Sequence, residues 1–200
     1  ISGVTTDRTV APTVDDDFDA DWGLDVKYGI TQNLTADLTY NTDFAQVEVD
    51  EQQINLTRFN LFFPEKREFF LEGRGIFDFG VTGFSPGRRV GNSPTLFFSR
   101  RIGLSRGEPV PILAGGRVTG KAGDFDVGAL SIQTDSKAST GVAETNFSVL
   151  RLKQDVLERS SIGMLYARRS ESTVSEGANE TYGADATFSY GDLNAVTFYA

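Results

Sequence analysis

The sequence predicts an all-β fold: an antiparallel up-and-down transmembrane β-barrel, of which this chain supplies part. Three observations support this prediction. Apolar and polar residues alternate with a period of two wherever the sequence is regular, short and long connections follow each other between the alternating segments, and aromatic residues gather at strand ends beside small residues. A soluble β-sandwich also alternates, with its polar face outward, and it remains the alternative fold.

The first two predicted strands form a hairpin. Apolar residues share one face of each strand on either side of a turn at 29–33, namely Ala20, Trp22, Leu24, Val26 and Tyr28, then Leu34, Ala36, Leu38 and Tyr40. Further strands are predicted at 112–121, 125–134, 145–154, 160–169, 180–190 and 192–200. The connections at 122–124, 155–159 and 191–192 are tight, whereas those at 135–144 and 170–179 are long and polar, which is typical of an up-and-down sheet.

A membrane barrel must point its apolar face to lipid and its polar face into the lumen. We therefore expect outward side chains at Trp22, Leu24, Val26, Leu34, Ala36, Leu38, Ala184, Ala186 and Phe188, and inward side chains at Asp25, Lys27, Asp37, Thr39, Asp185 and Thr187. The chain begins at Ile1 and its last strand pattern is unfinished at Ala200. We expect a piece of a larger protein whose sheet is not closed by this chain alone.

The composition removes most enzyme classes. The 200 residues contain no cysteine and no histidine, so thiolate nucleophiles, histidine bases, Ser-His triads and ordinary zinc sites are excluded. A carboxylate pair for glycoside hydrolysis remains, with Glu65 and Glu72 or Glu48 and Asp50 as nominal candidates. Such pairs are common without catalysis, and we expect neither an enzyme nor a cofactor. The net charge of −9 argues against nucleic acid as a partner.

The region 55–111 interrupts the strand pattern. It is rich in Phe and Gly, and residues 66–117 carry nine Lys and Arg against four acids in an otherwise acidic chain. Pro64 predicts a short helix over 65–72. We interpret 55–111 as an irregular basic insertion or plug, with candidate lumen residues Glu65, Lys66, Arg67, Glu68, Glu72, Arg74, Arg100 and Arg101.

The arginines of this region and the strand after it have two interpretations. Arg88, Arg89, Arg100, Arg101, Arg106 and Arg117 either line a pore that favours anions or form ion pairs with the acids of neighbouring strands. Both interpretations stay open.

The first 19 residues are acidic, and Asp15, Asp17 and Asp19 are weak calcium candidates. The EF-hand pattern fails because Ala20 stands where a glycine is needed and Val26 where a bidentate Glu is needed. We therefore interpret 1–19 as an acidic linker from an absent upstream domain, and 20–200 as barrel sequence that contains the 55–111 region.

Several long segments recur in order in one known family. NLTRFNLFFPEKREFFLEG (55–73), preceded by GLDVKYGITQNLTADLTYNTDFAQVEVD (23–50) and followed by IFDFG (76–80) and LFFSRRIG (96–103), resembles a family of uncharacterised bacterial outer-membrane β-barrels found downstream of a family-9 carbohydrate-binding-like domain. The resemblance implies the bacterial outer membrane as location and its lipid as a partner. It implies a channel, an anchor or a component of an envelope uptake system.

The resemblance does not name the solute. An oligosaccharide or another small solute, and other envelope proteins, are the further partners to expect, and carbohydrate handling is implied only by the family's usual upstream domain. A soluble glycan-binding β-sandwich, or a carboxylate-dependent glycoside hydrolase, is the alternative function.

Overall fold

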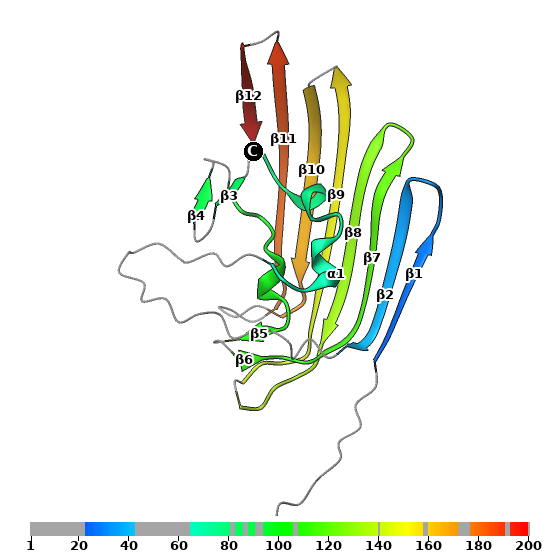
Figure 1. Ribbon diagram of the computed structural model, residues 1–200. Coiled ribbons are helices and arrows are strands. Elements are labelled where there is room, and N and C mark those ends of the chain that lie inside the picture. The colour runs from blue at the N-terminus through cyan, green and yellow to red at the C-terminus, as the bar shows by residue number, and fades with distance from the viewer. Residues whose placement is uncertain are drawn as a thin grey trace, which may run out of the picture.

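The computed structural model describes residues 23–42, 65–80, 83–85, 88–90, 94–105, 108–139, 141–157, 160–171, 177–190 and 193–199. Most of these residues belong to one eight-stranded antiparallel sheet (Figure 1). Its strands are β1 (Leu24–Gly29), β2 (Leu34–Thr42), β7 (Ile112–Ala122), β8 (Phe125–Thr134), β9 (Thr145–Leu157), β10 (Ser160–Arg169), β11 (Asn179–Tyr190) and β12 (Leu193–Tyr199).

The strands lie side by side in chain order, each antiparallel to the next. This arrangement confirms the predicted all-β class, the predicted hairpin and the alternation of short and long connections. Among the described strands, β1 and β12 form the two edges and do not pair with each other, so the sheet is open, as expected. Trp22, Asp15, Asp17, Asp19, Glu48 and Asp50 lie outside the described residues.

Short elements connect β2 to β7. They are α1 (Glu68–Leu71), β3 (Gly83–Ser85) paired with β4 (Arg88–Val90), and β5 (Leu104–Ser105) paired with β6 (Glu108–Pro109), together with the 3-10 helices η1 (Arg74–Phe77) and η2 (Ser99–Arg101). The helix predicted over 65–72 is therefore a single turn. It begins late because Arg67 is extended (φ −74°, ψ 124°), and its carbonyl accepts the first helical hydrogen bonds, from Phe70 and Leu71. None of the described helices is long and apolar enough to cross a bilayer.

The two faces of the sheet differ in polarity. One face, which we call the outer face, exposes large apolar side chains: Leu38 is 58% exposed, Met164 59% and Tyr182 79%. The other, inner face buries Asp37 and Thr39 on β2. The described members of the expected outward set lie on the outer face, where Leu24, Val26 and Phe188 are also exposed and Leu34, Ala36 and Ala186 are half-buried. The expected inward set lies opposite, with Asp25 and Lys27 exposed and Asp185 and Thr187 half-buried.

The inner face is covered by residues 65–80 and 94–105, which we call the covering segment (Figure 1). Its apolar side chains pack with those of β7 to β9 into one core. The buried members are Phe70, Phe77, Ile102, Ile112, Leu130, Ile132 and Val149, and Phe69, Phe97, Phe147 and Ala167 pack against them. The phenylalanines of the covering segment thus pack on the apolar part of the inner face, which lies beside its buried polar residues.

Glycines in the sheet make room for this cover. A Cβ at Gly128 on β8 would lie 2.8 Å from Ile76 Cγ2 and 3.0 Å from Phe77 Cε1. Because real Cβ atoms do not approach so closely, η1 sits directly on the backbone of β8. The sheet and the covering segment are therefore shaped to each other.

We predict that Gly128→Ala displaces η1 and lowers the free energy of unfolding by about 1–3 kcal/mol, the usual cost of overpacking. Gly75→Ala is the matched control, since a Cβ there has no atom within 4 Å. Urea unfolding of the two variants measures the difference. Equal stability of both variants would show that η1 does not rest on β8.

Candidate functional site

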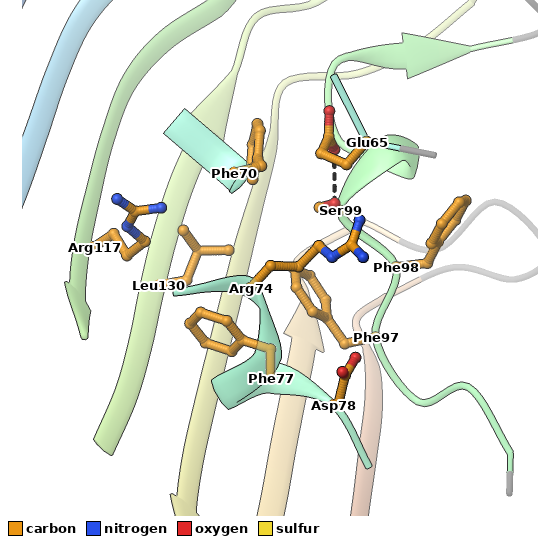
Figure 2. Close-up of a pocket in the computed structure, with 10 residues that line it drawn as sticks. All are labelled: Glu65, Phe70, Arg74, Phe77, Asp78, Phe97, Phe98, Ser99, Arg117 and Leu130. Atoms are coloured by element: carbon orange, nitrogen blue, oxygen red, sulfur yellow. Dashed lines mark hydrogen bonds between the residues drawn. The ribbon is translucent and has the colours of Figure 1, made fainter. Parts of the chain in front are cut away.

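The inner face and its covering segment form the candidate site. A cavity between them is lined by Glu65, Phe70, Arg74, Phe77, Asp78, Phe97, Phe98, Ser99, Arg117 and Leu130 (Figure 2). Arg74 lies in the middle of this group, with Phe77 beside it. The cavity measures about 50 Å³. That volume holds water but not a sugar ring, for which ligand pockets of roughly 300 Å³ or more are usual.

Glu65 and Arg67 form a buried ion pair at the start of the covering segment. Arg67 Nε donates to Glu65 Oε1 at 2.9 Å and Nη2 donates to Oε2 at 2.8 Å. The Ser99 hydroxyl donates to the same carboxylate at 2.6 Å. Arg67 also donates to the carbonyls of Ser99 (2.9 Å) and Ile102 (2.7 Å), and its guanidinium lies 4.2 Å from the centre of the Phe70 ring. The two halves of the covering segment are thereby joined.

The pair keeps Glu65 ionised. Burial works to raise the pKa of Glu65, but the hydrogen bonds and charge of Arg67 and the Ser99 hydroxyl outweigh it, so this pKa lies below its ordinary value of 4.5. A carboxylate bound in this way is an acceptor that fixes the chain, and its oxygens are already engaged by hydrogen-bond donors. It does not have the raised pKa that a general acid in glycoside hydrolysis needs.

A second ion pair joins the covering segment to the sheet. Arg117 on β7 donates through Nη2 to Asp37 Oδ2 on β2 at 2.6 Å. Its Nη1 donates to the Phe69 carbonyl and, at 2.6 Å, to the Glu72 carbonyl. The Arg117 side chain is 3% exposed. Arg117 therefore links its own strand, β7, to β2 and to the end of α1.

Glu72 adds a weaker contact to β1. Its carboxylate accepts a hydrogen bond from Lys27, and this bond holds the pKa of Glu72 below its ordinary value. Both side chains are about half exposed, so the pair contributes little to stability.

A third pair lies under the other end of the covering segment. Arg151 on β9 donates through Nη2 to Asp185 Oδ2 on β11 at 2.8 Å, and Gly80 N–H donates to the same oxygen at 3.1 Å. The strand between them, β10, contributes Gly163 at this point. A Cβ at Gly163 would lie 2.7 Å from Arg151 Nη1, so the guanidinium would have to shift if a larger residue replaced this glycine.

Two further arginines have no such partner. Arg101 on η2 is exposed, and Arg169 ends β10 on the inner face. In the part of the chain that the structure describes, neither has a carboxylate within ion-pair distance. The guanidinium of Arg169 lies 5.2 Å from the centre of the Phe147 ring.

The predicted candidates divide into groups. Glu65 and Arg67 are buried together, Glu72 contacts Lys27, Arg74 lines the cavity, Arg100 is buried, and Lys66, Glu68 and Arg101 are exposed. Arg117 forms an ion pair with a strand acid, which matches the second interpretation of the basic residues. The side chains of Arg88, Arg89 and Arg106 lie outside the described residues.

Sequence reasoning missed Ser99, Arg151 and Arg169 as members of the site. The sequence could have indicated Arg151. It alternates with leucines in Leu150-Arg151-Leu152-Lys153, and this alternation places it on the face opposite the two leucines. Ser99 had none, since its partner Glu65 is distant in sequence.

The fold and the site define a β-sheet protein whose polar inner face is covered by its own insertion. A family model described as a domain of unknown function (DUF5916) matches residues 3–111, more than half of the chain, and the chain belongs to this family. Neither the curated proteins nor the solved structures include a match.

We predict that the contact between Glu65, Arg67 and Ser99 loosens in acid. Because the folded pKa of Glu65 is lowered, its stabilisation is complete above about pH 4.5 and is lost as the pH falls further, through the folded pKa. Proteolysis of the covering segment between pH 7 and 3 measures the change. Glu65→Gln should be cleaved faster than wild type at pH 7 and gain little further on acidification, whereas exposed Glu68→Gln should behave as wild type. If Glu65→Gln is cleaved at pH 7 no faster than the wild type, this account is wrong.

We also predict that Asp185→Asn or Arg151→Met lowers the free energy of unfolding by about 3–5 kcal/mol, because each leaves a buried charge unpaired. The double variant Arg151→Met/Asp185→Leu should regain much of this loss. Arg168→Met is the control, since the Arg168–Glu180 pair is about half exposed and is worth about 1 kcal/mol or less. Chemical denaturation measures all four variants, and equal losses at Arg151 and Arg168 would contradict the assignment.

Proposed function

We propose that this chain forms a sector of a bacterial outer-membrane β-barrel, with lipid on the outer face and a narrow, partly filled lumen on the inner face. The observation that carries the proposal is the polarity of the two faces. Large apolar side chains are exposed on the outer face, while the inner one buries Asp37, Arg117 and Arg151 beside its apolar core. A sheet of a water-soluble protein exposes polar side chains to the solvent. An exposed apolar face of this kind therefore needs lipid or a protein partner to cover it.

The outer apolar residues form a band that runs obliquely across the strands. Side chains in one hydrogen-bonded row are apolar from β1 to β11: Tyr28, Ala36, Val118, Ala129, Leu150, Tyr166 and Tyr182. The row of Leu24 and Tyr40 instead becomes polar at Gln133 and Asn146. Strands in a membrane barrel are tilted, so a lipid band parallel to the bilayer crosses the rows at an angle. The oblique course of the apolar band across these rows therefore supports a sheet that is tilted in a membrane.

One border of the band has the character of a bilayer interface. Tyr166 and Tyr182 face each other across β10 and β11, and the next outer row holds the ion pair of Arg168 and Glu180. The Tyr166 hydroxyl donates to the Glu180 carboxylate at 3.1 Å. Aromatic rings followed by charged groups mark the level where hydrocarbon gives way to water. The described residues 135–139, 141–144, 170, 171, 177 and 178 of the two long connections follow this border, so we propose that they face the outside of the cell.

The remainder of the outer face also suits lipid. An open groove of about 490 Å³ crosses β8 to β11 and has a mainly apolar lining, which includes Phe125, Leu152, Ile162, Met164, Ala184 and Ala186. Acyl chains fill such irregular surfaces without hydrogen bonds.

The covering segment determines what the lumen does. Its hydrogen bonds to β1, β7 and β11 make it a fixed part of the wall, and the cavity of about 50 Å³ beside it is too small for a sugar ring. We infer a channel for small solutes, or an anchor in an envelope uptake system, in which further strands complete the barrel. The soluble glycan-binding β-sandwich is the competing function, and it needs a second sheet over the outer face.

We predict that Met164→Arg weakens folding of the protein into lipid vesicles by about 2–4 kcal/mol, because it places a charge in the middle of the apolar band. Ser131→Arg is the matched control on the same face, in the polar row beyond the band, and should cost about 1 kcal/mol or less. Urea-dependent folding into vesicles, followed by circular dichroism, measures both. A protein that folds as a soluble monomer in plain buffer, unaffected by Met164→Arg, would contradict the membrane proposal.

A further inference from the structure

The outer face of the sheet carries one pair of charged residues. Among the described residues of the eight strands, Arg168 on β10 and Glu180 on β11 are the only charged side chains at outer positions. They stand opposite each other in the register of these strands, in the row next to Tyr166 and Tyr182. The rest of this face does not share such a feature.

The two charged groups are only partly used by each other. Arg168 reaches Glu180 Oε1 through Nε, at 3.3 Å, and the Tyr166 hydroxyl donates to the same oxygen. Nη1 and Nη2 of Arg168 have no acceptor among the described residues, and Oε2 of Glu180 has no donor among them. Both side chains are about half exposed. Donors and an acceptor are thus available to a ligand at this point.

The apolar groove of about 490 Å³ on the outer face lies on the same two strands. Its lining includes two successive rows of their register, Met164 with Ala184 and Ile162 with Ala186. The methyl side chains of the two alanines leave room that larger residues would fill. The volume falls within the roughly 300–1,000 Å³ that ligand pockets have. Along β10 and β11, the outer face therefore changes in order from a charged row, through a tyrosine row, to an apolar groove.

This order matches a single amphiphilic molecule. From Tyr166 to Ile162 the strand advances four residues, which is about 14 Å. The hydrocarbon of one membrane leaflet is about 15 Å deep, half of the bilayer core. An acyl chain that lies in the groove therefore brings its headgroup to the tyrosine row, within reach of Arg168.

We infer that the groove and Arg168 form a binding site for one phosphorylated membrane lipid, with an acyl chain on Ala184 and Ala186 and the phosphate on Nη1 and Nη2. A guanidinium binds a phosphate through paired N–H donors. Oε2 of Glu180 accepts a hydrogen bond from a hydroxyl or an amine of the same headgroup. The site depends only on the outer-face geometry, whereas the location of this lipid in a membrane rests on the proposed function.

Two variants remove the two halves of the site. Arg168→Gln removes the phosphate contact, and loss of its half-exposed ion pair costs little stability. Ala184→Phe fills the groove. The matched controls are Arg101→Gln, which changes the net charge equally at an exposed residue of the covering segment, and Ala36→Phe, which adds the same ring on β2, away from the groove.

The experiment is native mass spectrometry of the folded protein in a non-ionic detergent, titrated with dioleoylphosphatidylglycerol and, separately, with dioleoylglycerol. The two lipids share their acyl chains, but only the first has a phosphate. We expect one phosphatidylglycerol to bind saturably to wild type and to both controls. Binding should be about tenfold weaker in Arg168→Gln, which loses charged hydrogen bonds, and in Ala184→Phe, whose ring displaces about two methylene groups. Dioleoylglycerol should bind wild type and Arg168→Gln equally weakly.

Three results would overturn the site. Binding of phosphatidylglycerol that Arg168→Gln and Ala184→Phe leave unchanged is the first, and equal weakening in the two controls is the second. The third is a dimer of the chain that excludes lipid, because a second copy would then cover the groove. Equal affinity of wild type for the two lipids would overturn the assignment of the phosphate to Arg168.

Folding into vesicles separates this inference from the proposed function. A protein that folds into vesicles but shows no saturable lipid binding in detergent would support the membrane proposal and overturn the site. A soluble monomer in plain buffer that binds phosphatidylglycerol with the expected dependence on Arg168 would support the site and contradict the barrel.

Discussion

Two buried arginines on the sheet, Arg117 and Arg151, hold this structure together. Each binds an aspartate on another strand, Asp37 or Asp185, and one member of each pair also hydrogen-bonds the backbone of the covering segment. An arginine buried alone would cost several kcal/mol, so the aspartates make the polar inner face possible. The covering segment in turn keeps water from these pairs. Sheet, ion pairs and cover therefore depend on one another.

Small residues make this arrangement sterically possible. Gly163 leaves a path for Arg151 across β10, and Gly128 lets Ile76 and Phe77 rest on the backbone of β8. The covering segment itself has little regular structure beyond a single helical turn and two 3-10 turns. These elements supply few internal hydrogen bonds. Its shape comes instead from Arg67, which gathers Glu65 and two distant carbonyls around one guanidinium.

The difference between the two faces of the sheet is the reason why we propose a membrane setting. The inner face holds the buried ion pairs and, on β8 and β9, the apolar core under the covering segment. The outer face exposes an oblique apolar band bordered by tyrosines and an ion pair. The family to which the chain belongs has no assigned function, so the argument for a barrel rests on this polarity.

The sequence by itself determined the strands, their order and their faces, because a period of two is a local property: the segment predicted at 125–134 is β8, and Asp37 and Asp185 face inward as the alternation requires. It also marked 55–111 as irregular. Only the tertiary structure decided the partners. Ser99 meets Glu65, and Arg151 reaches Asp185 past Gly163, through contacts between distant segments. A local pattern records which face a residue occupies, whereas the residue it contacts depends on how the covering segment folds back onto the sheet.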